Sequence, residues 1–121
     1  MIYLAAPYSH PSPTVRRQRY WEACRAAAGL LRAGHAVFSP LQQGHPLVED
    51  HGVPMDWAWW ALACMEYLTR SDEIIVLTLN GWSESVGVTA EIGIARTLGK
   101  PVRYLAPSPP SLARVTPEAR P

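Results

Sequence analysis

The chain has 121 residues, of which 48% are apolar and 17% are charged, and its formal net charge is +1. This length is enough for one compact domain and too short for two. The near-neutral charge argues against a protein that binds a nucleic-acid polymer or a membrane surface. No apolar run approaches the ~20 residues that a membrane-spanning helix needs, and the short run Ile2–Ala6 is interrupted by Pro7, so we expect no signal peptide.

Cysteine and histidine usage gives no sign of a metal or redox centre. Cys24 and Cys64 have neither a metal-ligand nor a redox spacing, and the four histidines do not share one element at ligand spacing. We therefore expect a reduced, cytoplasmic setting, with a single disulfide as the open alternative. We expect neither a metal nor a cofactor.

The first third of the chain predicts a strand, a helix and a second strand. A buried strand covers Ile2–Ala6. A helix follows from Thr14, its expected N-cap, to about Ala33, with Gly34 as its left-handed stop. The second strand covers Ala36–Ser39.

The remaining elements continue the alternation of strands and helices, so the predicted order is β-α-β-α-β-α-β. In chain order we expect a polar loop at Leu41–Val53, a helix from near Pro54 to about Leu68, a strand at Ile74–Leu79, a turn-rich loop at Asn80–Gly87, a third helix, and a strand at Pro101–Leu105.

This order predicts a small α/β, flavodoxin-like (Rossmannoid) three-layer sandwich, with a parallel sheet of four to five strands and helices on both faces. Ligands bind such sheets at the carboxyl ends of the strands, where the strand order switches. The loops Pro7–Pro13, Gln42–His51 and Asn80–Gly87 should therefore meet at one edge. Residues 1–105 form the predicted domain, and the Pro-rich segment 106–121 forms a tail, either mobile or laid over a neighbouring subunit.

The segment from Ser85 to Glu91 carries the sharpest chemical signal. Ser85 is a natural N-cap, so the following backbone N–H groups would open a helix toward an anion, and Gly87 would let a ligand approach closely. Glu91 shares the core-facing stripe of Val88 and Ile92. Its carboxylate is either a nucleophile beside that site or a favourable charge in the early turns of a capped helix.

Other candidates each have a structural alternative. Tyr3, in the middle of the first strand, either orients Glu91 or fills the core. Arg16 or Arg17, in the first turn of a helix, either binds a phosphate or lies in solvent. Three tryptophans within residues 57–60 cannot all face one side, so at least one should contact a partner subunit or a planar ligand.

Four segments resemble the nucleoside 2-deoxyribosyltransferase-like superfamily over about residues 1–105, and most closely a small bacterial and phage branch of domains without assigned function. The S-x-G-V-x-x-E pattern is also similar to that of the 2′-deoxynucleoside 5′-monophosphate N-glycosidases. The segments are IYLAAPYS, GHAVFSP, SDEIIVL and GWSESVGVTAEIGIARTLGKPVRYL.

The resemblance implies that Glu91 attacks the anomeric carbon, that Tyr3 orients Glu91, and that Ser85 lies near a phosphate. It implies an N-glycosidase or 2-deoxyribosyltransferase that takes a small nucleoside or nucleotide. The alternative is a nucleotide- or ADP-ribose-type binding protein without catalysis. The expected substrate-binding residues are Ser85, Gly87, Pro7, Ser9, His10, Arg17, Trp82, Asp56 and His45.

One position departs from the superfamily pattern. Cys64 stands where the superfamily usually has an aspartate that assists protonation of the leaving base. A neutral thiol is a poor proton donor, so Asp56 or His45 would have to replace it, or the substrate would need a better leaving group. The short chain and its many aromatic residues also favour a homo-oligomer, either a dimer or a tetramer.

Overall fold

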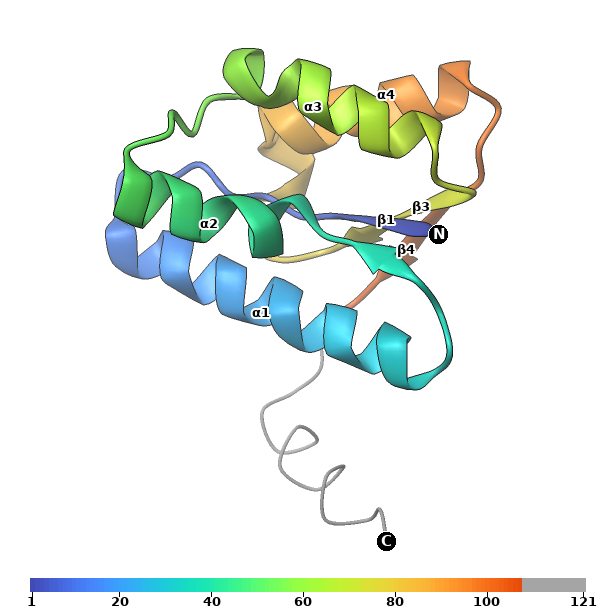
Figure 1. Ribbon diagram of the computed structural model, residues 1–121, viewed down its shortest axis with the longest axis horizontal. Helices are drawn as coiled ribbons and strands as arrows, with labels where there is room; N and C mark the ends of the chain where they lie inside the picture. Colours follow the sequence, from blue (N-terminus) through green and yellow to red (C-terminus); the bar gives the residue numbers. More distant parts are fainter. Residues whose placement is uncertain (108–121) are drawn as a thin grey trace, which may run out of the picture.

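The computed structural model describes residues 1–107, and these fold into four strands, four α-helices and one 3-10 helix (Figure 1). In chain order the elements are β1 Ile2–Ala5, α1 Pro13–Arg32, β2 Val37–Phe38, α2 Pro40–His51, α3 Trp57–Thr69, β3 Glu73–Leu77, η1 Trp82–Glu84, α4 Val86–Thr97 and β4 Val102–Leu105.

The four strands are parallel and lie in the order β2-β1-β3-β4. From β1 the chain passes to β2 on one side and then crosses to β3 on the other, so the strand order switches between β1 and β3. Tyr3 on β1 is paired with Ile74 on β3 at this switch. The predicted flavodoxin-like α/β sandwich is confirmed, with four strands in its sheet.

Helices cover both faces of the sheet (Figure 1). Helix α1 lies on one face, with the start of α2 packed beside it, and α3 and α4 lie on the other face. Successive side chains of a strand point to opposite faces, so Leu4 packs with Ala23 of α1, whereas Tyr3 packs with Leu68 of α3 and Ile92 of α4. Because both faces are covered, the central strands are apolar at nearly every position.

The prediction of a polar loop at Leu41–Val53 is wrong, because most of this segment forms helix α2. The side chain of Ser39 caps the helix by accepting a hydrogen bond from the backbone N–H of Gln42 at 3.2 Å. Pro40 occupies the first turn, where its missing N–H costs nothing. The helix ends at Gly52, whose φ of 69° is the left-handed conformation that favours glycine.

Smaller corrections concern where elements begin and end. Ser12, rather than Thr14, caps α1, and its hydroxyl accepts from the N–H of Val15 at 3.4 Å. Helix α3 begins at Trp57, after Asp56 as N-cap, and β3 ends at Leu77. Of the predicted Pro-rich segment, residues 108–121 lie outside the described residues. Within residues 1–107, no helix is long and apolar enough to cross a membrane.

Candidate functional site

A cavity of about 700 Å³ opens at the carboxyl ends of β1 and β3, between α2, α3 and the start of α4. This is the switch point at which the sequence predicts a ligand site. The residues that line the cavity are Ala6, Tyr8, Ser9, Arg19, Pro40, Leu41, Gly44, His45, Val48, Met55, Asp56, Trp57, Ala58, Trp60, Cys64, Gly81, Glu84, Ser85, Val86, Gly87 and Glu91.

The carboxyl group of Glu91 lies at the inner end of the cavity. Glu91 belongs to the second turn of α4 and is only 4% exposed, on the same buried stripe as Val88 and Ile92. The hydroxyl of the fully buried Tyr3 donates a hydrogen bond to Glu91 Oε2. The contact between these two side chains, which the sequence suggests, is therefore present.

Burial controls the ionisation of this carboxyl. Removal from water raises the pKa of Glu91 to about 8, and the hydrogen bond from Tyr3 opposes only part of that rise. The pKa of Tyr3 is raised well above its usual value, first by burial and then by the charge of Glu91. The unliganded site therefore carries a mostly neutral Glu91 at pH 7, and the carboxylate dominates only above about pH 8.

Cys64 lines the same cavity, from α3. Its side chain is 4% exposed, and burial raises the pKa of its thiol to about 11, with the nearby charge of Glu91 adding to the rise and Tyr3 opposing it. A thiol with this pKa stays protonated at neutral pH and releases its proton reluctantly. Cys64 is thus a neutral, weakly acidic group close to Tyr3 and Glu91.

The amino end of α4 forms another part of the wall. The Ser85 hydroxyl accepts a hydrogen bond from the N–H of Val88 at 3.2 Å, so Ser85 is the N-cap that the sequence predicts. Ser85, Val86 and Gly87 all line the cavity. Unsatisfied N–H groups and the helix dipole favour an anion at such a helix start.

Aromatic and aliphatic side chains from α2 and α3 make up further parts of the wall. Trp57 and Trp60 of α3 line the cavity together with Leu41 and Val48 of α2. A Cβ at Gly87 would lie 3.6 Å from the Trp57 ring, so Trp57 borders the start of α4. A Cβ at Gly44 would lie 3.2 Å from the Trp60 ring, so the glycine lets α2 approach Trp60 closely. These flat surfaces suit a planar, weakly polar group of a ligand.

Arg19 holds together the two loops that follow β1 and β3. Its guanidinium donates to the carbonyls of Tyr8 and Ser9 at 3.3 and 3.1 Å, and to that of Asn80 at 3.2 Å. It lies so close to Gly81, whose φ is 90°, that a Cβ there would be 2.9 Å from Arg19 Nη2. Arg19 therefore shapes the rim of the cavity and belongs to its lining.

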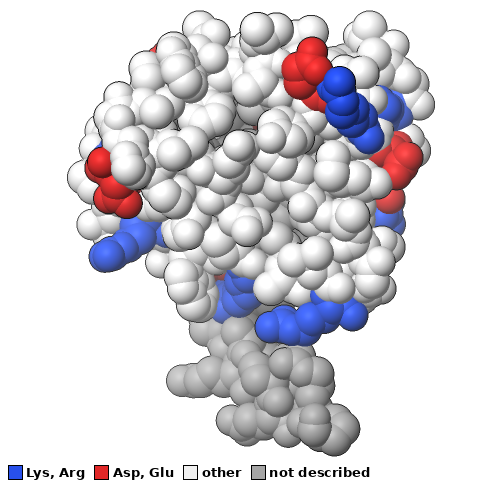
Figure 2. All heavy atoms as spheres, in the orientation of Figure 1, with Lys and Arg blue, Asp and Glu red and all other residues white. Residues whose placement is uncertain are grey.

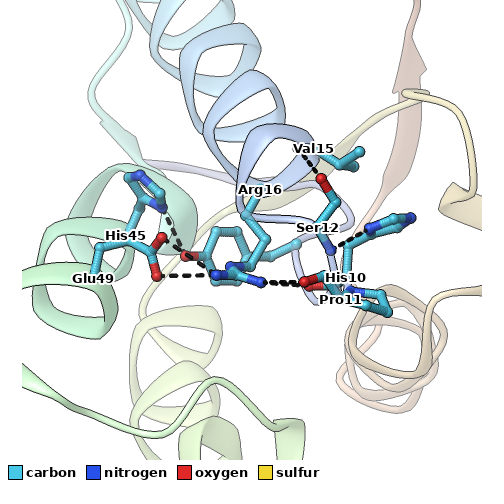
Figure 3. A network of polar contacts seen from close by, with 8 residues as sticks. His10, Pro11, Ser12, Val15, Arg16, His45 and Glu49 are labelled. Atoms are coloured by element: carbon cyan, nitrogen blue, oxygen red, sulfur yellow. Dashed lines mark hydrogen bonds and ion pairs between the residues drawn. The ribbon is translucent and has the colours of Figure 1, made fainter.

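A polar network ties α2 to α1 and to the loop after β1 (Figure 3). The Arg16 guanidinium lies between the carbonyls of His10 and Pro11 on one side and the Glu49 carboxylate on the other, with Nη1 2.6 Å from the His10 oxygen and Nη2 3.3 Å from Glu49 Oε1. Beside it, His45 Nδ1 and the Tyr8 hydroxyl are hydrogen-bonded at 2.7 Å. Helix α2 is thus attached to α1 and to this loop through the side chains of His45 and Glu49.

The structure brings together most, but not all, of the residues that the sequence selects. Ser9, His45, Asp56, Ser85 and Gly87 line the cavity with Glu91, whereas Tyr3 reaches it through its bond to Glu91. The Ser9 hydroxyl is engaged with the Met55 carbonyl at 3.0 Å. Asp56 is exposed and makes no side-chain cap to α3.

Four selected residues do not belong to the lining of this cavity. Pro7 is fully buried, and the His10 ring accepts a hydrogen bond from the N–H of Ser12 at 3.0 Å. Arg17 faces a second cavity, between α1 and α2. Trp82 packs against Tyr104, with ring centroids 5.4 Å apart. They lie outside this cavity, and their expected part in substrate binding stays a prediction.

Several lining residues escape the sequence reasoning because they depend on α2 or on loop geometry. Leu41, Gly44 and Val48 share one helix face with the selected His45 at the spacing i, i+3, i+4, i+7, a signal that was available in the sequence. Tyr8 and Arg19 carried no comparable signal, since their roles come from contacts between loops far apart in the chain.

No group of three or more His, Cys, Asp or Glu side chains within residues 1–107 could hold a metal ion.

Among curated proteins, none matches the sequence. The family model described as "Domain of unknown function (DUF1937)" matches residues 1–106. The chain therefore belongs to the DUF1937 family.

Proposed function

We propose that the protein cleaves or transfers the N-glycosidic bond of a nucleoside or nucleotide, with Glu91 as the nucleophile. The observation that carries this proposal is a buried carboxyl at the inner end of a ligand-sized cavity, bonded to the Tyr3 hydroxyl. Such a carboxyl is costly to the fold, and nothing in the packing of α4 requires it. The resemblance to the nucleoside 2-deoxyribosyltransferase-like superfamily supports the same assignment.

In the proposed reaction, a Glu91 oxygen forms a bond to the anomeric carbon while the carbon–nitrogen bond to the base breaks. The base leaves with the bonding electrons and takes up a proton. Water then attacks the glycosyl-enzyme to release the sugar, or a second base attacks it to complete transfer. Tyr3 orients the carboxyl, and the cavity walls hold the substrate close to it.

The walls suggest how such a substrate lies. The base would pack against Trp57 and Trp60, and a 5′-phosphate would lie at the amino end of α4, near Ser85 and Gly87. Because Cys64 is a weak acid, the proton for the leaving base is proposed to come from Asp56 or His45, which both line the cavity.

The test is release of free base from deoxynucleosides and their 5′-monophosphates by the full-length chain at pH 8.5, where Glu91 is ionised. Glu91→Gln keeps the shape and should lower the rate at least 100-fold, whereas Glu66→Gln, on the exposed side of α3, should leave it unchanged. If the Glu91→Gln variant is as active as the parent, Glu91 is not the nucleophile.

A second candidate function is nucleotide or ADP-ribose-type binding without catalysis, and Cys64 is the observation that favours it. Titration calorimetry beside the same assay separates the two, because binding without turnover supports the second. Cys64→Asp is a further test. If the parent lacks only a proton donor for the leaving base, this variant should raise turnover tenfold or more. Cys24→Asp, on α1 outside the cavity lining, is the matched control.

The setting proposed from the sequence is unchanged: a cytoplasmic homo-oligomer that takes a small nucleoside or nucleotide rather than a nucleic-acid polymer or a membrane. Such an oligomer requires an exposed surface that a second copy of the chain can cover.

A further inference from the structure

The outer surface of the α3/α4 layer is apolar although it faces solvent. Leu62 is 74% exposed, Val86 71%, Trp59 54% and Met65 45%. These four side chains lie on two neighbouring helices that pack against the same face of the sheet. Single exposed apolar residues are ordinary on a protein surface, but several on two adjoining helices favour an interaction site.

Charge is also missing from this surface. Residues 57–65 of α3 include no Asp, Glu, Lys or Arg, and residues 86–95 of α4 include only the buried Glu91. In Figure 2 the surface along the top of the view, over α3, is uncharged across its middle. Acidic atoms lie near its left end, and a mixed acidic and basic group lies near its right end. A charged partner would find nothing to pair with across its middle.

The two ends of the layer differ in charge. Asp56 and Glu84 are exposed where α3 and α4 begin. At the other end Glu66 and Arg70 are bonded to each other, Arg96 is exposed in the last turn of α4, and the Lys100 ammonium donates to the carbonyls of Thr69 and Ser71. Both helices run in the same direction, from left to right in Figure 1. Two copies that meet face to face with their helices antiparallel would therefore set Asp56 and Glu84 of one copy near Arg96 of the other.

We propose that this layer, defined by the exposed Trp59, Leu62 and Met65 of α3 and Val86 of α4, is the contact surface for a second copy of the chain. A two-fold arrangement is self-complementary by symmetry, which suits a surface with an apolar centre and charges of opposite sign at its ends. A Cβ at Gly93, an exposed position of α4, would meet no atom within 4 Å, so the helix leaves room there for close approach of the partner.

The test is the mass of the 121-residue chain at 10–100 µM by analytical ultracentrifugation. The parent should sediment at twice the 13.4 kDa of one chain, or at a multiple that Leu62→Glu halves. Leu31→Glu introduces the same change on α1, at a leucine that is 54% exposed on the other side of the sheet, and should keep the parent's mass. Circular dichroism shows whether both variants fold.

The charge pattern is tested by a separate pair of variants. Arg96→Glu should raise the dimer dissociation constant at least fivefold, and adding Glu84→Arg should recover most of that loss. A parent that sediments as a single chain overturns the proposal, as does a folded Leu62→Glu variant with the parent's mass or a Leu31→Glu variant that dissociates equally. Failure of the double charge reversal to recover overturns the antiparallel arrangement.

Discussion

At the scale of single residues, Glu91 is the position that the sequence predicts best. Its place three residues after Val88 puts it on the buried face of a helix, and that placement is what the structure has. The partner of its carboxyl, Tyr3, lies 88 positions away. The residues alone left its role open between orienting Glu91 and filling the core, and the family resemblance favoured the first. Periodicity can locate a side chain on its own element, but it cannot name what meets that side chain across the core.

The raised pKa of Glu91 predicts how stability depends on pH. In the unfolded chain the group ionises near its usual value of 4.5, and in the folded chain near 8. Between these values the unfolded state gives up the proton and the folded state keeps it, so the free energy of unfolding falls as pH rises, by up to ~1.4 kcal/mol for each pH unit. Above about pH 8 this loss is complete.

Glu91→Gln removes that titration. The free energy of unfolding of the variant, relative to that of the parent, should therefore rise between pH 5 and 8 and stay constant above pH 8. Urea unfolding at each pH measures the difference, and Glu66→Gln should follow the parent throughout. Tyr3 and Cys64, which face the carboxyl, have pKa values raised above their usual 10.0 and 9.0, so they add little slope below pH 8, and both groups are present in the variant and in the parent. If the difference in the free energy of unfolding between the Glu91→Gln variant and the parent is the same from pH 5 to 9, the raised pKa of Glu91 is wrong.

At the scale of elements, α2 is the part of the site that the sequence reasoning missed. Polar residues, Gly44 and an internal Pro46 make the segment look irregular, yet Ser39-Pro40 at its start and Gly52 at its end are ordinary helix boundaries. The helix is held by tertiary contacts more than by its own propensity. Its contacts with α1 and with the loop after β1 are therefore the place to test it.

Arg16→Ala should loosen α2. It removes hydrogen bonds to two carbonyls and the ion pair to Glu49 from a side chain that is only 11% exposed, so we expect a loss of ~1–3 kcal/mol in the free energy of unfolding. Hydrogen exchange should speed up in residues 40–51. Arg17→Ala, at the next and exposed position of α1, should do neither. Equal effects of the two substitutions would mean that the network does not hold α2.

At the scale of the whole molecule, the alternation of strands and helices was enough to predict the layers and the edge at which the cavity opens, because parallel connections leave few topologies. Which surface remains open to a partner could not be predicted in the same way. Exposure depends on how two helices share one face of the sheet, and the sequence alone does not determine which side of α3 the sheet covers.

The cavity and the proposed contact surface share a border, and this predicts that ligand binding and association are linked. Met55, Ala58 and Val86 line the cavity and are exposed, and Val86 also belongs to the proposed contact surface. A second copy on that layer would reach the rim and bury it further, so ligand affinity should be higher in the dimer. Deoxynucleoside 5′-monophosphates should lower the dimer dissociation constant, and by reciprocity Leu62→Glu should weaken their binding about 5- to 10-fold. Calorimetry on that variant beside Leu31→Glu measures the effect; equal affinities in the two would show that the rim is complete in one chain.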